Sequence, residues 1–344
     1  MSKKAKKITI FLSVILLLSQ TSFLVVSAMP TDDEEDDNLV YLGEHPITSE
    51  AAIVIDFATG LVIFELNKDE QRVPASMTKM IAVYVVFDAI RDGLVDFDTM
   101  LAITEEASLF SYVRAFSNVE LPPESAYTLR ELLDVVIVRS ASAATIALGE
   151  GIFGSEAALV EKMNEKVNEL GIEAVFYDSW GGSRDNRISA HGMAELTRAF
   201  INEYPEILEI TSQESVFFDE VEYRSTNPLL IDYEGVDGFK TGFTRPAGWC
   251  FAGTAEQEGR RLITVTMGSV QGYRFPDTII LLDYGFAYYN ITIASHFRGA
   301  AHSIDMFLNL TAPLIPIKKF NIYESQYLDI RDLAIILNET PKID

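Results

Sequence analysis

Ser76-Met77-Thr78-Lys79 and, far along the chain, Lys240-Thr241-Gly242 are the two stretches that decide the fold of this 344-residue protein. Residues three apart are neighbours on a helix surface, so we expect the Ser76 hydroxyl and the Lys79 amine to lie together. A serine hydroxyl is a weak nucleophile that needs an adjacent base, and a lysine acts as a base when burial or another cation lowers its pKa. The first stretch therefore predicts a nucleophile and its base, and Lys240 is a candidate for the second cation.

The residues around each stretch predict where it lies. After Lys79 the chain is apolar from Met80 to Phe87, which predicts a helix buried on most faces and opened by Ser76. The backbone N–H of Ser76 then belongs to the unpaired amides of a helix start, which can bind an oxyanion. Residues 235–268 predict strands, the last two joined in a hairpin around residues 256–259. Lys-Thr-Gly is thus expected on a strand at the edge of a sheet.

These motifs resemble those of the D-alanyl-D-alanine carboxypeptidases, penicillin-binding serine peptidases that share Ser-x-x-Lys, Ser-x-Asn and Lys-Thr-Gly. The similarity runs from about Val40 to Tyr289 and includes residues 51–60, 115–119 and 281–286. It implies an α+β fold, an antiparallel sheet packed with a helical cluster as in β-lactamases and transpeptidases. The pattern of the chain agrees with this fold. It predicts a strand pair at 52–66, a helix that begins near Thr128, further helices at 155–170, 189–202 and 276–289, and strands late in the chain. Thr128 and Glu131 suit a capping box.

The middle motif departs from the family pattern. The matching residues are Arg139-Ser140-Ala141-Ser142, so Ser140 keeps the serine while Ser142 replaces the asparagine. A carboxamide both accepts and donates hydrogen bonds, and the shorter serine hydroxyl is expected to lose reach toward the lysine and the substrate. Taken alone, the two serines would indicate only a small-residue patch between two closely packed helices.

The resemblance implies a mechanism on the matching residues. Ser76 attacks the carbonyl of the penultimate D-alanine of a peptidoglycan stem peptide, Lys79 takes its proton, and Ser140 relays a proton to the leaving D-alanine. The substrate-binding residues implied are Lys240 and Thr241 at the terminal carboxylate, Gly242, Phe243, whose N–H joins that of Ser76 in the oxyanion hole, and Ser142. β-Lactam antibiotics are implied as covalent inhibitors at Ser76, and Arg245 is a further candidate for attracting the carboxylate.

Two other functions remain open. A serine β-lactamase has the same motifs but deacylates quickly, and no Glu-x-x-Leu-Asn stretch that would activate the water lies between the second and third motifs. An envelope protein that keeps the fold only to bind peptidoglycan is the other alternative, suggested by Ser142.

The N-terminal end of the chain indicates export. Residues 1–28 combine four lysines, an apolar run and Val26-Ser27-Ala28, which is the pattern of a cleaved signal peptide. Residues 29–39 hold six consecutive acids and are expected to be a disordered linker, followed by the serine peptidase domain at 40–290. Residues 291–344 form a short C-terminal segment whose role the sequence does not define. The protein is therefore expected at the extracellular face of the envelope or in the medium.

Charge and composition exclude several classes of function. The 27 basic and 51 acidic residues give a net charge of −24, which argues against a nucleic-acid partner. The four histidines and the single cysteine, Cys250, show no metal-ligand spacing, so no metal or other cofactor is expected. Cys250 lies in a predicted strand and is expected to be a buried apolar side chain.

Overall fold

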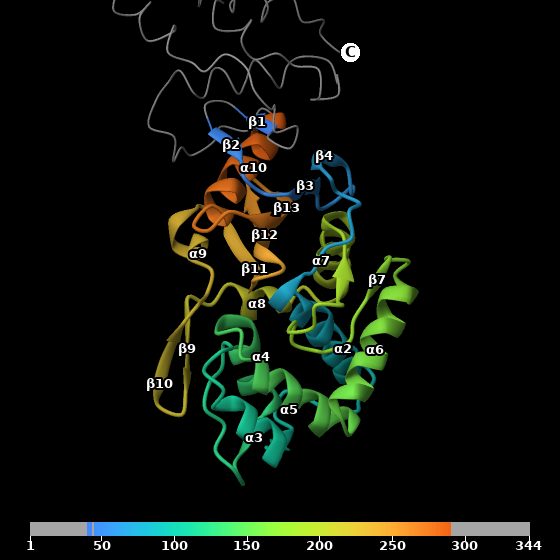
Figure 1. Ribbon diagram of the computed structural model, residues 1–344, viewed down its shortest axis with the longest axis vertical. Helices are drawn as coiled ribbons and strands as arrows, with labels where there is room; N and C mark the ends of the chain where they lie inside the picture. The colour runs from blue at the N-terminus through green and yellow to red at the C-terminus, as the bar shows by residue number, and fades with distance from the viewer. Residues whose placement is uncertain (1–39, 43–44, 290–344) are drawn as a thin grey trace, which may run out of the picture. The chain divides into compact units, whose positions relative to one another are not determined.

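A five-stranded antiparallel sheet organises the domain in the computed structural model, which describes residues 40–42 and 45–289 (Figure 1). The strand order is β11-β12-β13-β3-β4. Strands β3 (Ala51–Asp56) and β4 (Val62–Leu66) come from the start of the described chain, and β11 (Val236–Thr244), β12 (Gly248–Gln257) and β13 (Arg260–Ser269) from its end. The β13–β3 pairing therefore joins the first and last parts of the domain in one sheet.

Both faces of the sheet are covered, because β3 is buried along its whole length. Ala51, Ile53 and Ile55 point into one apolar core, and the alternate residues Ala52 and Val54 point into a second core. Helix α10 (Arg274–Tyr288) packs on the second core, while α7 (Ala190–Glu203) packs on the first with most of the other helices. A strand enclosed on two sides is a run of apolar residues instead of an alternating pattern, as β3 is from Ala51 to Ile55.

The helical cluster lies in the middle of the chain. Its members are α2 (Lys79–Arg91), preceded by the 3₁₀ turn η1 (Ala75–Thr78), α3 (Glu105–Ser111), α4 (Leu129–Val138), α5 (Ser142–Phe153), α6 (Glu156–Glu169) and α8 (Ile207–Thr211). The short helix α9 (Leu229–Asp232) packs instead with the second core. The remaining described strands form two-stranded sheets, namely β1 (Val40–Leu42) with β2 (His45–Ile47), β5 (Met100–Ala102) with β6 (Ala126–Thr128), β7 (Ala174–Val175) with β8 (Arg187–Ile188), and β9 (Ser215–Phe218) with β10 (Val221–Arg224).

The predicted fold class is confirmed in the part of the chain that the structure describes. The hairpin between β12 and β13 turns at Glu258 and Gly259, as predicted, and Thr128 and Glu131 form both bonds of the capping box. The expected signal peptide, the acidic linker and the C-terminal segment 291–344 lie outside the described residues. Among the described helices none is by itself long and apolar enough to cross a membrane, and α5 with α6 meets that test only as a pair bent by 88°.

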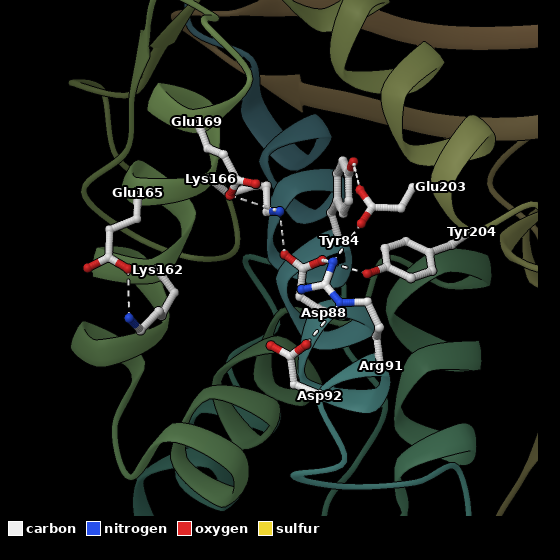
Figure 2. Close-up of polar contacts among 10 residues, drawn as sticks. All are labelled: Tyr84, Asp88, Arg91, Asp92, Lys162, Glu165, Lys166, Glu169, Glu203 and Tyr204. Atoms are coloured by element: carbon white, nitrogen blue, oxygen red, sulfur yellow. Dashed lines mark hydrogen bonds and ion pairs between the residues drawn. The ribbon is translucent and has the colours of Figure 1, made fainter.

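An ionic network fixes the end of α2 that lies farthest from Ser76 (Figure 2). The Asp88 carboxylate accepts from Lys166 Nζ of α6 at 2.7 Å and from the Tyr204 hydroxyl at 2.6 Å. Glu203 of α7 accepts from the Tyr84 hydroxyl at 2.6 Å. Two neighbouring helices are thus bonded to α2, and the position of that helix, which begins at Lys79, is set from both sides.

The Lys166–Asp88 pair is expected to contribute more to stability than an exposed pair on the same helix. The Lys166 side chain is only 7% exposed, so Lys166→Met, which keeps its apolar stem, should leave Asp88 short of a partner and cost about 2 kcal/mol of unfolding free energy. Lys162, bonded to Glu165 on the surface of α6, provides the matched control, and Lys162→Met should cost at most about 0.5 kcal/mol. Urea denaturation of both variants tests this, and equal losses would contradict it.

Candidate active site

Ser76 and Lys79 lie together at the start of α2. Ser76 sits in the η1 turn, whereas we expected it to open the α-helix itself; the α-helix begins at Lys79. The Lys79 ammonium donates to Ser76 Oγ over 3.1 Å. Ser76 is partly exposed, while Lys79 is fully buried. The serine is therefore partly open to an incoming molecule, while the amine beside it is shielded from solvent.

Burial alters the acid–base behaviour of Lys79. Loss of hydration lowers its pKa to about 7, and the negative charge of Asp178 acts in the opposite direction. We expected Lys240 to depress this pKa, but burial is the main cause. Burial also lowers the pKa of Lys240, with repulsion from Lys79 as the next contribution. A large fraction of Lys79 is neutral near pH 7, as a general base requires.

Lys79 Nζ makes two further hydrogen bonds, to Ser142 Oγ at 3.2 Å and to the backbone carbonyl of Trp180 at 2.6 Å. A neutral amine has two N–H donors and one lone pair. When the two donors are directed to Ser142 and Trp180, the lone pair remains for the Ser76 hydroxyl. In that arrangement Ser76 is the group that can lose its proton to Lys79.

Asp178 shapes the loop that presents the Trp180 carbonyl. Its carboxylate accepts the backbone N–H groups of Gly181, Gly182 and Ser183 at 2.6–2.9 Å and a side-chain N–H of Asn186 at 2.9 Å. Hydrogen bonds to an ionised carboxylate are among the strongest in proteins. The loop thus folds around the Asp178 carboxylate, and the Trp180 carbonyl in this loop points at Lys79.

Two glycines allow the backbone to approach Ser76 closely. Gly181 has φ = 91°, and a Cβ at this position would come within 2.0 Å of the Ala75 carbonyl oxygen. At Gly242, on β11, a Cβ would lie 2.7 Å from the carbonyl oxygen of Pro74. Any larger residue at either position would push the Asp178 loop or β11 away from the serine.

The middle motif lies at the turn between α4 and α5. Ser142 begins α5, and its hydroxyl reaches Lys79, so the expected loss of reach toward the lysine is wrong. Ser140 is also buried at this turn, with φ = 65°, and within the described residues its hydroxyl forms no hydrogen bond. The structure therefore places the Ser142 hydroxyl against Lys79. Ser140 lies two residues before Ser142 in the chain, at the same turn.

The third motif lies on the edge strand β11, as predicted. Lys240 and Thr241 are buried, and Phe243 is 47% exposed. Lys240 Nζ donates to the Thr241 carbonyl at 3.2 Å, and Thr241 Oγ1 contacts Thr226 Oγ1 at 2.8 Å. Within the described part of the chain Lys240 has no carboxylate partner, and burial together with Lys79 and Arg274 lowers its pKa. An unpaired buried cation is a site that an anion would stabilise.

Arg274 is a residue of this site that the sequence analysis missed. From the start of α10 its Nη1 donates to the Gly242 carbonyl at 3.2 Å, its guanidinium lies over the Trp249 ring, and its buried Nε lacks a hydrogen-bond partner among the described residues. Burial lowers its pKa to about 10. Arg245, the arginine that the sequence suggested for this role, is exposed.

The described residues contain no cluster of three or more His, Cys, Asp or Glu side chains that could hold a metal ion. Cys250 pairs with Gly242 across the β11–β12 ladder and is buried, as predicted. Burial raises the pKa of its thiol to about 11, so it stays protonated at neutral pH. The polar groups of the site are thus serine and threonine hydroxyls, lysine amines, one guanidinium, the Asp178 carboxylate and backbone amides and carbonyls.

A family profile described as D-alanyl-D-alanine carboxypeptidase matches residues 39–271. The chain belongs to this family. The curated relative D-alanyl-D-alanine carboxypeptidase DacF of Bacillus subtilis is 29% identical over 70% of this chain and 63% of its own length. The match thus spans somewhat less than two thirds of that relative.

Solved structures of penicillin-binding proteins share the fold. Penicillin-binding protein 5 of Haemophilus influenzae is 32% identical with a TM-score of 0.68, covering 71% of this chain and 73% of that chain. Penicillin-binding protein D2 of Listeria monocytogenes, solved in its cefotaxime-bound form, is 29% identical with a TM-score of 0.64 and covers 71% and 99%. The family and the fold that the sequence motifs indicated are therefore confirmed.

Proposed function

We propose that this protein is a serine D-alanyl-D-alanine carboxypeptidase that removes the terminal D-alanine from peptidoglycan stem peptides. The observation that carries this proposal is the contact between Ser76 Oγ and the buried amine of Lys79, whose pKa of about 7 makes it a base. Family membership and the curated relatives named for this activity support the choice of substrate. The signal-like pattern of residues 1–28 fits a reaction outside the cytoplasm.

The reaction proceeds in two steps on these residues. Neutral Lys79 takes the Ser76 proton while Oγ attacks the carbonyl carbon of the penultimate D-alanine. The C–N bond then breaks, and the proton passes from Lys79, with Ser140 as a relay, to the nitrogen of the departing D-alanine. Water hydrolyses the ester and restores both residues. The backbone N–H groups of Ser76 and Phe243 are the donors we assign to the oxyanion.

The substrate carboxylate provides the negative charge with which the buried Lys240 on β11 can pair. Lys240 and Thr241 are the residues we assign to it, and the Arg274 guanidinium beside Gly242 adds positive charge to the same place. A bound carboxylate opposes the depression of the Lys240 pKa, because an opposite charge favours the protonated amine. Ser142 can accept from Lys79 and donate its own proton to the substrate amide carbonyl.

Slow deacylation distinguishes this function from that of a β-lactamase. The carboxylate whose charge acts on Lys79 is Asp178, and its oxygens already accept four hydrogen bonds. The acceptor sites of this carboxylate are therefore taken up within its own loop. β-Lactams, one of which is bound in the Listeria structure, are therefore expected to acylate Ser76 and to remain attached.

A labelled penicillin should form one covalent adduct, at Ser76. Intact-mass measurement should show this adduct in the wild type and not in Ser76→Ala, and an acylated tripeptide ending in D-alanyl-D-alanine should lose D-alanine only with the wild type. An adduct that persists in Ser76→Ala would place the nucleophile elsewhere. Adduct formation without release of D-alanine would favour a binding protein, and rapid loss of the adduct would favour a β-lactamase.

The two lysines should respond differently to replacement by arginine. Lys79→Arg should abolish acylation, since a guanidinium stays protonated and cannot act as the base. Lys240→Arg keeps the charge and should retain part of the acylation rate. Second-order rate constants for one penicillin, with melting temperatures to confirm folding, test this assignment. Equal residual rates in the two variants would contradict it.

The pH dependence follows from the lowered pKa of Lys79. The neutral amine is the reactive form, so the second-order rate constant for acylation should rise as pH increases through about 7 and level off above that value. Below the transition, the rate constant should fall about tenfold per pH unit. A stopped-flow or quenched titration from pH 5 to 9 measures the profile. A rate constant that still rises tenfold per pH unit up to pH 9 would show that the pKa of Lys79 is not lowered.

A further inference from the structure

A pair of hydroxyl groups lies behind the third motif. Thr241 Oγ1 on β11 lies 2.8 Å from Oγ1 of Thr226, which belongs to the connection between β10 and α9. Thr241 is buried and Thr226 is partly buried. In the part of the chain that the structure describes, Thr226 is the one side chain to which the Thr241 hydroxyl is bonded. The orientation of one hydroxyl therefore depends on the other.

The backbone at Thr226 is held from two sides. Its N–H donates to the carbonyl of Val138 at 3.0 Å, and Val138 is the last residue of α4. The next residue, Asn227, is buried, and its side chain donates to the Gly238 carbonyl of β11 at 3.4 Å. Thr226 thus has a fixed position between the strand of the third motif and the end of the helix that leads to Ser140.

The number of protons in this pair decides which hydroxyl donates when a substrate is bound. A threonine hydroxyl has one proton and two lone pairs, so either member of an isolated pair can be the donor. An ionised carboxylate can only accept. When Thr241 donates its single proton to the carboxylate that we assign to it, its oxygen can bond to Thr226 only as an acceptor. Thr226 is then the donor.

A hydrogen bond from Thr226 changes how Thr241 binds an anion. It fixes the rotation of the Thr241 hydroxyl, and it polarises that O–H bond, because hydrogen bonds in a chain strengthen one another. Hydrogen bonds to a charged acceptor are stronger than those between neutral groups. The contribution of Thr226 should therefore be expressed mainly in the binding of a carboxylate at Thr241.

We propose that Thr226 is a positioning residue for the substrate carboxylate, which donates to Thr241 and so directs the Thr241 hydroxyl at that carboxylate. This role rests on the proposed function, because that function assigns the carboxylate to Lys240 and Thr241. The carboxylate is bound both before and during the attack by Ser76. Loss of the Thr226 hydroxyl should therefore weaken substrate binding and leave the chemical step nearly unchanged.

Two substitutions separate the hydroxyl from the rest of the side chain. Thr226→Val removes the hydroxyl and keeps the shape of the side chain, whereas Thr226→Ser retains a hydroxyl. The measured quantities are kcat and KM for release of D-alanine from an acylated tripeptide that ends in D-alanyl-D-alanine. In Thr226→Val, KM should rise about fivefold while kcat changes by less than about twofold. In Thr226→Ser, both constants should lie within about twofold of the wild-type values.

Thr211→Val is the matched control. Thr211 of α8 is also bonded to β11 through its hydroxyl, which donates to the backbone carbonyl of Asp237 at 2.7 Å. Its loss should lower the melting temperature and leave KM unchanged. An unchanged KM in Thr226→Val would overturn the proposed role. An equal rise of KM in Thr211→Val would also overturn it, by showing that the two threonines only anchor the strand.

The proposed function can fail separately from this role. A wild type that is acylated by a penicillin but releases no D-alanine from the peptide would overturn the carboxypeptidase function. The penicillin carboxylate then serves as the probe, and a second-order acylation rate constant about fivefold lower in Thr226→Val, restored in Thr226→Ser, would support the role of Thr226. An unchanged rate constant in Thr226→Val would overturn it. Melting temperatures confirm that each variant is folded.

Discussion

The Lys79 amine is fully buried among three oxygen atoms, those of Ser76, Ser142 and the Trp180 carbonyl, and the rest of the site is arranged around it. Burying an ammonium without a carboxylate partner is costly, and the protein meets that cost by lowering the pKa of the group. The same burial that destabilises the charged form creates a base at neutral pH. Burial of Lys79 thus lowers the folding stability of the protein at the position where a proton acceptor is required.

The scaffold holds this amine from two directions. At the far end of α2, Asp88 and Lys166 attach the helix to α6, so α2 cannot slide along its axis without breaking a largely buried ion pair. Near Ser76, Gly242 brings the edge strand β11 against the carbonyl of Pro74. A sheet edge has unpaired backbone groups, which in other proteins can pair with the strand of another chain and cause aggregation. Here they face the site, where an extended substrate could pair with them.

The sequence predicts those parts of the site that depend on neighbouring residues. Ser76 and Lys79 lie within one turn, the β12–β13 hairpin turns at a glycine, and Thr128 caps its own helix, so each has a local signal. Trp180 and Arg274 carried no such signal. Trp180 acts through a backbone carbonyl 101 residues from Lys79, and any residue type has a carbonyl. The only sequence signal near Trp180 is Asp178 followed by Gly181 and Gly182, because an acidic residue before two glycines is typical of a tight loop whose backbone N–H groups bond to the carboxylate.

Ser142 shows how the site tolerates a departure from the family pattern. A carboxamide brings an acceptor and a donor on two atoms, whereas a hydroxyl carries both on one. Its oxygen accepts from Lys79 at 3.2 Å, and its proton remains free to be donated. Because Ser142 begins α5, and its own N–H is fixed by Ser117, that hydroxyl has a defined position in spite of its short side chain. The hydrogen bond to Lys79 is thus retained, and what serine gives up, compared with a longer carboxamide, is distance toward a substrate.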